Sequence, residues 1–287
     1  MIRVFPRRTK WIPTDELAFV GDPPMMRPID QPVRVSVTFT WDKAEGERLA
    51  WAWAQCYSDV QLGGPAFNDL GAEFIPSQFV KQGITITSRG CPWHCPWCFV
   101  PNREGSIREY PIKDGWIVQD NNLLGCSRSH IEDVFDMLSH QSHGASLNGG
   151  LDVRLLKQWH IDLLKSIRIS ELWFACDEVA SLPVIERAAD LVSDFPRSKK
   201  RCFVMIGYNG EALRDAEARL ERVYELGFDP FSQLYQPEQR LDYPATWRAL
   251  NRKWSRPAAY RASKAQHNPS FKPMNGLTNY CTELLRR

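Results

Sequence analysis

The chain has 287 residues, of which 43% are hydrophobic and 24% are charged, and its net charge is +2. These values are ordinary for a soluble globular protein that buries a full hydrophobic core. No apolar run approaches the length of a membrane span, and the first residues lack the apolar stretch of a signal peptide. We therefore expect a cytoplasmic protein that makes no membrane contact and keeps its cysteines reduced.

The first 80 residues are predicted to form a small Rossmann-like α/β extension. The pattern predicts a strand over 33–40, a helix over 42–57, and a short strand from residue 60 into Gly63-Gly64-Pro65. We interpret this extension as a cap that packs on the larger unit that follows it.

Residues 81–240 alternate between strand and helix patterns, which is typical of a parallel sheet wrapped by helices. The predicted strands cover 83–89, 115–123, 144–151, 171–177, 201–207 and 229–235. The predicted amphipathic helices cover 130–140, 156–167, 182–195, 211–226 and 244–254. Functional side chains of such a unit are expected where its strands end.

Three cysteines, Cys91, Cys95 and Cys98, lie within eight residues directly after the first of these strands. Three and then two residues separate them, so their thiolates can hold three irons of a cubane cluster and leave the fourth iron without a protein ligand. An iron with an open position can bind a reactant, as catalytic metal sites do.

This Cys-x3-Cys-x2-Cys motif, with the aromatic Trp97 before its last cysteine, resembles the motif of the radical S-adenosylmethionine (SAM) superfamily. The resemblance implies a 4Fe-4S cluster on the three cysteines and SAM bound to the open iron. It also implies a partial (β/α)6 TIM-like barrel over 81–240 and an electron donor such as a flavodoxin or ferredoxin. The enzyme would cleave SAM reductively to a 5′-deoxyadenosyl radical, which abstracts hydrogen from an unidentified substrate.

The N-terminal extension resembles a truncated cobalamin-binding domain of one radical SAM branch. It lacks the Asp-x-His-x-x-Gly segment that supplies a histidine to cobalt. The resemblance therefore does not extend to cobalamin, which disfavours a methylase or methylthiolase.

Three other readings of the cysteines stay open. Zinc would need a fourth ligand, and His94 is adjacent to Cys95, which makes the required geometry difficult. A disulfide lacks the oxidising compartment that it needs. A second cluster would have to use the scattered thiols, for which no ligand spacing exists; Cys176 and Cys202 lie in apolar runs and are expected in the core. The scattered cysteines are Cys56, Cys126, Cys176, Cys202 and Cys281.

Two strand ends resemble segments that contact the methionyl part of SAM in the superfamily. Asn121 and Asn122 stand where Gly-Gly-Glu often contacts the methionyl amine, although both residues also suit a turn. Asp152 and Arg154 belong to a segment similar to Gly-Leu-Asp-Ile-Arg. They could contact SAM or substrate, or they could form an internal salt bridge.

Three further residues are candidates for the adenosine part. Trp97 would lie near the adenine. Asp177 ends a strand and could bind the ribose, or serve a local turn or helix cap. Gly207 loosely matches a superfamily segment near adenine, but with Gly210 it could simply form a turn.

The C-terminal segment, 241–287, is predicted to be a helix and a basic tail. Ten Lys and Arg residues against three acids from residue 238 onward give a local excess of +7. Cations beside aromatic rings suit a nucleotide or nucleic-acid substrate, whereas rings that pack on the barrel would leave those cations merely solvated. The rings are Tyr243, Trp247, Trp254, Tyr260, Phe271 and Tyr280.

The sequence thus predicts a radical SAM enzyme whose substrate is unknown. Two alternatives remain open: a non-catalytic iron–sulfur or zinc protein that binds nucleic acid, and a radical SAM methylase or methylthiolase.

Overall fold

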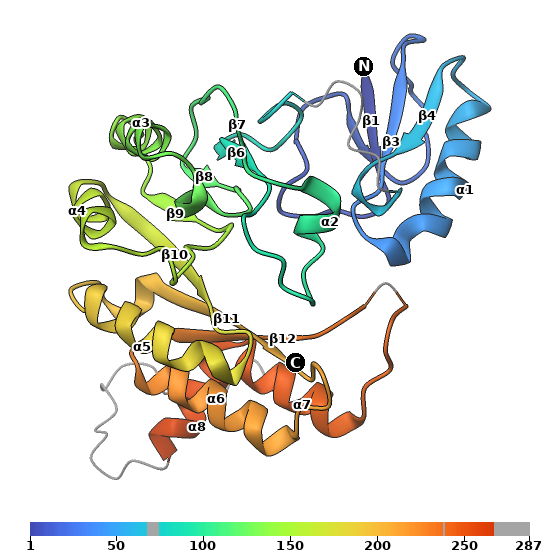
Figure 1. The fold of residues 1–287 in the computed structure, drawn as a ribbon. Coiled ribbons are helices and arrows are strands. Elements are labelled where there is room, and N and C mark those ends of the chain that lie inside the picture. The colour runs from blue at the N-terminus through green and yellow to red at the C-terminus, as the bar shows by residue number, and fades with distance from the viewer. Residues whose placement is uncertain (68–74, 238, 267–287) are drawn as a thin grey trace, which may run out of the picture.

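A computed structural model describes residues 1–67, 75–237 and 239–266, with side chains described up to residue 262. The chain is a mixed α/β protein built on two parallel sheets and one short antiparallel pair (Figure 1). None of its described helices combines the length and the apolar character that crossing a membrane requires.

The N-terminal sheet has four parallel strands in the order β2-β1-β3-β4. Its elements are β1 (Ile2–Phe5), β2 (Ala18–Val20), β3 (Val33–Ser36), helix α1 (Lys43–Ala54) and β4 (Val60–Gly63). The predicted β3, α1 and β4 are confirmed, with β3 and α1 shorter than expected. The sequence pattern did not reveal β1 and β2, because each has only three or four residues and lies close to prolines and charged side chains.

One face of this sheet packs on α1. Ile2 and Val4 of β1 and Val35 of β3 are buried there against Leu49 and Trp53 of the helix. The indole of Trp53 donates to the Gly21 carbonyl at 3.0 Å, so this large ring is buried without leaving its N–H unpaired.

The larger sheet has six strands, all parallel and adjacent in the same order as along the chain. They are β5 (Ile84–Thr85), β8 (Ile117–Val118), β9 (Ala145–Leu147), β10 (Ile169–Ala175), β11 (Lys200–Ile206) and β12 (Asp229–Leu234). Each predicted strand of this unit has a counterpart here. Strands β5 and β12 are the two edges of the sheet.

The predicted strand over 83–89 is wrong as a single element. It divides into β5 and β6 (Ser88–Arg89), and β6 turns away to pair antiparallel with β7 (Arg108–Glu109). The division occurs because the carboxylate of Asp120 takes the Thr87 backbone N–H, which a continuing ladder with β8 would otherwise use, and also the Ser88 N–H.

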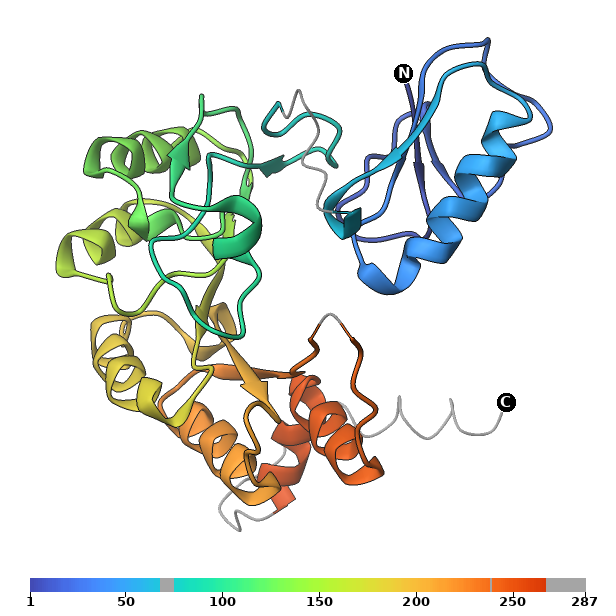
Figure 2. The ribbon, with the colours of Figure 1, turned by 45° about the vertical axis from the view of Figure 1, so that its right-hand side comes forward.

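The predicted helices are confirmed to within a few residues. The helices after residue 80 are α2 (Val100–Glu104), α3 (Arg128–Ser139), α4 (Gln158–Ser166), α5 (Leu182–Leu191), α6 (Leu213–Glu225), α7 (Ala245–Trp254) and α8 (Pro257–Gln266). Short 3-10 turns cover Thr40–Asp42, Pro65–Phe67, Leu123–Gly125, Val179–Ser181 and Arg197–Lys199. The sequence pattern did not predict α2 or α8. Figure 2 shows helices α3 to α6 along the outer side of the curved sheet.

The two faces of the large sheet differ. On the helix side, Leu172 and Phe174 of β10 and Val204 of β11 are fully buried. On the opposite side, Trp173 and Phe203 stack at 4.3 Å and are only partly covered. One face therefore forms the core, and the other presents aromatic surface beside the strand ends.

The C-terminal helices close the core at β12. Trp254 and Tyr260 are fully buried, with ring centroids 5.1 Å apart, and Arg261 pairs with Asp229 at the start of β12. The expectation that tail aromatics pack on the sheet is confirmed for these two rings, which are not free to stack on bases. The described side chains end at residue 262. The remaining residues predicted for the tail lie beyond this point: Lys264, Phe271, Lys272, Tyr280, Cys281, Arg286 and Arg287.

Replacement of Gly149 tests the close approach of β8 and β9. A Cβ on Gly149 would lie 1.6 Å from the Asp120 carbonyl oxygen, so Gly149→Ala must push two backbones apart. We expect a loss of about 3 kcal/mol in the free energy of unfolding, measured by urea titration. Gly210→Ala is the control, since its Cβ meets no neighbour and only its positive φ costs about 1 kcal/mol. Equal losses in the two variants would contradict the close approach.

Candidate active site

The cysteine loop, residues 90–99, connects β6 to α2 and lies where the strands of the large sheet end. Cys91 donates its N–H to the Gly105 carbonyl at 3.1 Å, and Cys98 donates to the Cys95 carbonyl at 2.9 Å. All three cysteines are free and partly covered. Backbone hydrogen bonds within the loop and to Gly105, at the end of α2, thus hold it in place, and its thiols are partly covered.

The base of the loop is fastened by the buried carboxylate of Asp120, which is 2% exposed. It accepts from the backbone N–H groups of Thr87 at 2.7 Å and Ser88 at 3.0 Å, and from both hydroxyls. These four hydrogen bonds use nearly all of the acceptor sites of the carboxylate. A charged carboxylate can be buried only when it is hydrogen-bonded in this way. The side chain therefore joins the end of β8 to the strand that leads into the cysteines.

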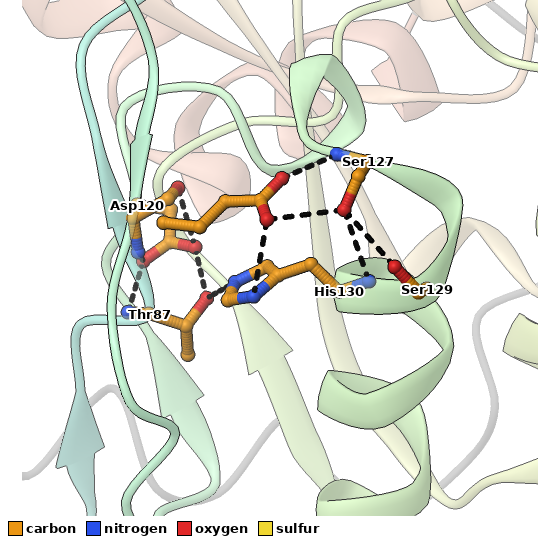
Figure 3. Close-up of polar contacts among 7 residues, drawn as sticks. Thr87, Asp120, Ser127, Ser129 and His130 are labelled. Atoms are coloured by element: carbon orange, nitrogen blue, oxygen red, sulfur yellow. Dashed lines mark hydrogen bonds and ion pairs between the residues drawn. The ribbon is translucent and has the colours of Figure 1, made fainter.

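A second layer supports this clamp from α3 (Figure 3). The imidazole of His130 lies 3.1 Å from the Thr87 hydroxyl and 3.9 Å from the Glu109 carboxylate on β7. Glu109 in turn accepts from the backbone and hydroxyl of Ser127, the residue before α3. The network connects β6, β7, α3 and the end of β8 through polar contacts that the hydrophobic pattern does not indicate.

Asn122 and Asp152 approach the loop on the side of Cys91. The Asn122 amide nitrogen lies 3.5 Å from the Cys91 sulfur and donates to Asp152 at 2.9 Å. Asp152 also accepts from the indole of Trp93 at 2.6 Å. The strand ends of β8 and β9 are therefore connected directly to the cysteine loop.

The guanidinium of Arg154 joins Asp152 to the cysteine loop. Its guanidinium makes a paired contact with both Asp152 oxygens, at 2.8 and 2.9 Å, and stacks over the Trp93 ring at 4.2 Å. It also lies 3.9 Å from the Cys95 sulfur. Burial acts to raise the pKa of the Asp152 carboxyl, but the hydrogen bonds and charge of Arg154 outweigh it and hold that pKa below its ordinary value.

The internal salt bridge between Asp152 and Arg154 is thus confirmed. It forms beside the cysteines, where a guanidinium could also meet an anionic ligand.

Trp97 and Asp177 meet on the other side of the loop. The Trp97 side chain lies close enough to the Asp177 carboxyl to lower its pKa, and its ring packs edge-on against Tyr208 at 5.4 Å. Burial raises the pKa of Asp177, and the Met205 N–H, the Arg219 charge and the Trp97 contact oppose that rise. The ends of β10 and β11 are therefore brought to the cysteine loop by an aromatic side chain of the loop itself.

Burial also raises the pKa of the Cys98 thiol, and the nearby Cys95, Cys91 and Asp177 add to the rise while the Val100 N–H opposes it. A metal must displace the proton of this thiol on binding. Metal loading is therefore expected to release protons and to be favoured by higher pH.

Asn121 and Gly207 lie at the edge of this arrangement. The Asn121 amide oxygen accepts the Gly90 N–H at 3.0 Å, so this side chain holds the loop entrance. Gly207 and Gly210 both have positive φ, 77° and 72°, which confirms the turn interpretation of this pair. Gly207 donates its N–H to Glu211 at 2.9 Å.

Two buried amide oxygens stay without a partner in the described structure: Asn122 Oδ1 and Asn148 Oδ1. Asn122 is only 4% exposed, so an unpaired oxygen there costs free energy unless a ligand donates to it. An ammonium group is the type of donor that fits such an oxygen beside the thiols. The cysteine ligand set, this oxygen and Arg154 are chemically compatible with a cubane cluster and an amino-acid ligand.

Among the described residues, no three Cys, His, Asp or Glu side chains converge on a point that one metal ion could fill. A cubane cluster does not require such convergence, because each thiolate binds a different iron.

Sequence reasoning missed Trp93, Asp120 and Asn148 as members of the site. Trp93 stands inside the cysteine motif and Asp120 directly precedes the two asparagines, so both had a positional signal. Asn148 opens the segment that was recognised for Asp152 and Arg154, but only its burial shows that its oxygen lacks a partner.

No model of a known protein family matches this chain. No curated protein matches it either.

Asp120→Asn tests the clamp beneath the loop. An amide oxygen can replace one carboxylate oxygen, but the NH2 group would face donors, so several contacts are lost. We expect the metal-free protein to lose about 3 kcal/mol of unfolding free energy and to retain less iron after reconstitution. Asp136→Asn, at a carboxylate whose side chain is 76% exposed, is the control and should change stability little. A loss no greater than that of the control would refute the clamp.

Proposed function

We propose that the protein is a radical SAM enzyme with one 4Fe-4S cluster. The observation that carries the proposal is the Cys91-x3-Cys95-x2-Cys98 loop together with the polar side chains that three neighbouring strand ends bring against it. These side chains follow three different strands: Asn122 follows β8, Arg154 follows β9 and Asp177 follows β10. Asn122 reaches the Cys91 sulfur and Arg154 reaches the Cys95 sulfur. The charge of Asp177 raises the pKa of the Cys98 thiol.

We further propose that the large sheet is a partial (β/α)6 TIM-like barrel. Six parallel strands in chain order, with helices on the outer side, are the arrangement from which such barrels are built. Its chemistry would lie at the carboxyl ends of the strands, where the cysteine loop is.

Different residues would bind different parts of the cluster and of SAM. Cys91, Cys95 and Cys98 would each hold one iron, Asn122 and Arg154 would receive the amine and carboxylate of the methionyl group, and Trp97 and Asp177 would border the adenosine. When bound and reduced, the cluster would supply the electron that splits SAM into methionine and a 5′-deoxyadenosyl radical.

The protein's own contribution would be orientation and exclusion of water. The salt bridge of Arg154 to Asp152 fixes the guanidinium, and the rings of Trp97, Tyr208 and Tyr235 pack edge-on in a row at the strand ends. Such a row shields a reactive intermediate from solvent. Hydrogen abstraction from a substrate that enters beside this row is the reaction class that we propose.

Replacing Cys91, Cys95 and Cys98 with Ala tests the metal centre. The parent protein, purified without oxygen, should contain close to four irons and four sulfides per chain, and the triple variant should lose both together with its brown absorbance. Chelation of iron from the parent should have the same effect.

Cys56→Ala is the matched control, since it removes a thiol from the N-terminal unit and should retain the full iron content. Stoichiometric zinc without sulfide in the parent would refute the proposal.

Asn122→Ala tests the SAM site. In the reconstituted parent, SAM should change the electron paramagnetic resonance spectrum of the reduced cluster, and dithionite should drive release of 5′-deoxyadenosine. The variant loses the unpaired buried oxygen, so its affinity for SAM should fall about tenfold, a cost of about 1.4 kcal/mol in equilibrium dialysis.

Asn102→Ala on the exposed side of α2 is the control and should bind SAM like the parent. A loaded cluster whose spectrum does not respond to SAM would favour the non-catalytic iron–sulfur protein instead.

A further inference from the structure

A cavity lies at the carboxyl end of β12, between the segment that follows this strand and the first turn of α7. Its volume is about 350 Å³, which is the size of a site for a small molecule. The chain after β12 extends toward the N-terminal unit before it returns to α7 (Figure 1 and Figure 2). Two leucines and five polar or charged residues line the cavity, the latter being Gln236, Arg240, Asp242, Tyr243 and Arg248.

Two polar side chains hold the segment that forms this cavity. The amide nitrogen of Gln236 donates to the Leu241 carbonyl at 3.2 Å, and its amide oxygen accepts the Leu241 N–H at 2.9 Å. The Tyr243 hydroxyl lies 2.8 Å from the Tyr235 carbonyl oxygen and 3.2 Å from that of Gly207. The walls of the cavity are therefore fixed before any ligand binds, and Tyr243 connects them to the ends of β11 and β12.

Two arginines give the cavity a positive charge. Arg248 pairs with Asp242 at 3.0 Å, but their side chains are 55% and 95% exposed, so water screens the pair and it contributes little stability. Arg240 is exposed, and its guanidinium lies 5.7 Å from the centroid of the Trp41 ring. The lining residues thus carry two cations against one loosely paired acid. A guanidinium binds a carboxylate or a phosphate through two parallel hydrogen bonds.

The N-terminal unit supports one of these two cations. Trp41 belongs to the short 3-10 turn after β3, and its ring stacks on Phe39 at 4.8 Å. The same ring lies under the guanidinium of Arg240, which comes from the other end of the chain. The N-terminal unit therefore takes part in the charge of the cavity, in addition to the capping role that its sequence pattern predicts.

We propose that this cavity, here named the anion cavity, binds the carboxylate or phosphate group of a small substrate through Arg240 and Arg248. The inference rests on the proposed function in one respect, that the ligand is the substrate. The ring of Tyr235, at the edge of the cavity, packs on Tyr208 at 4.8 Å, and Tyr208 contacts Trp97 of the cysteine loop. A ligand anchored by its anionic end would thus be oriented beside the row of rings that leads to the candidate active site.

The binding test titrates the purified whole chain in a calorimeter with three probes of similar size: glucose 6-phosphate, glucuronate and glucose. At least one of the two anions should bind, and neutral glucose should not. The tighter of the two anions tells whether the cavity prefers phosphate or carboxylate. Binding should weaken as salt rises, because both arginines are exposed.

Two pairs of substitutions locate the binding site. Arg240→Gln with Arg248→Gln should lower the affinity for the bound anion about tenfold and flatten its salt dependence. Arg252→Gln with Arg256→Gln, which removes two exposed charges around the end of α7, is the matched control and should bind like the parent.

Trp41→Ala tests the contribution of the N-terminal unit. Without the ring, Arg240 loses its cation–π contact, so the affinity for the anion should fall about threefold. Trp51→Ala, which removes a 69% exposed ring from α1 of the same unit, is the control and should leave the affinity unchanged.

The inference is overturned if neither anion binds at low salt, if glucose binds as tightly as the anions, or if the Arg240/Arg248 variant binds like the parent. If the parent instead binds single-stranded RNA through these two arginines and ignores the small anions, the surface belongs to a nucleic acid and the anion cavity is refuted.

A turnover measurement separates the anion cavity from the proposed function. The titration needs neither cluster nor SAM, so its result stands even if dithionite yields no 5′-deoxyadenosine in the parent, an outcome that refutes the proposed function alone. Where dithionite does yield it, saturating anion should change the rate of release in the parent and not in the Arg240/Arg248 variant. An unchanged rate in the parent would refute the assignment of the ligand as substrate.

Discussion

The buried carboxylate of Asp120 is the interaction on which the geometry of the site depends. It takes the backbone donors of Thr87 and Ser88, so the chain cannot continue as one strand and instead turns into the cysteine loop. A carboxylate with four donors is stable in a low-dielectric interior, whereas the same charge without them would be very costly. His130 and Glu109 extend the support to α3, and the position of the three cysteines above the strand ends follows from this clamp.

The groups around the cysteine loop include buried acids and thiols and one arginine. Burial raises the pKa values of Cys98 and Asp177, so a set of thiolates there needs cations or metal to be stable. Arg154 supplies a cation there, 3.9 Å from the Cys95 sulfur and paired with the covered Asp152. One side chain therefore links Asp152 and the Cys95 thiol at the candidate site.

The prediction of individual elements succeeded where periodicity is strong and failed where tertiary contacts override it. Strands β10 and β11 have seven residues each, and the apolar runs within them reveal them in the sequence. Strands β1 and β2 lie among prolines and charged side chains, and they exist because β1 pairs with both β2 and β3 in a sheet that buries Ile2 and Val4. The split of 83–89 into β5 and β6 results from a side chain more than thirty positions away, which no local pattern contains.

The sequence by itself determined the chemistry that is available: three thiols at a cluster spacing, and polar residues after successive strands of a parallel α/β unit. Only the tertiary structure decided which of those residues act together. Asn121 and Asn122 are adjacent in sequence, yet one binds the loop backbone and the other reaches Cys91 and Asp152. Trp97 and Asp177 are eighty residues apart in sequence, yet Trp97 is close enough to lower the pKa of the Asp177 carboxyl. The reason is physical: burial and hydrogen-bond partners depend on what the folded chain brings together, and those contacts are long-range.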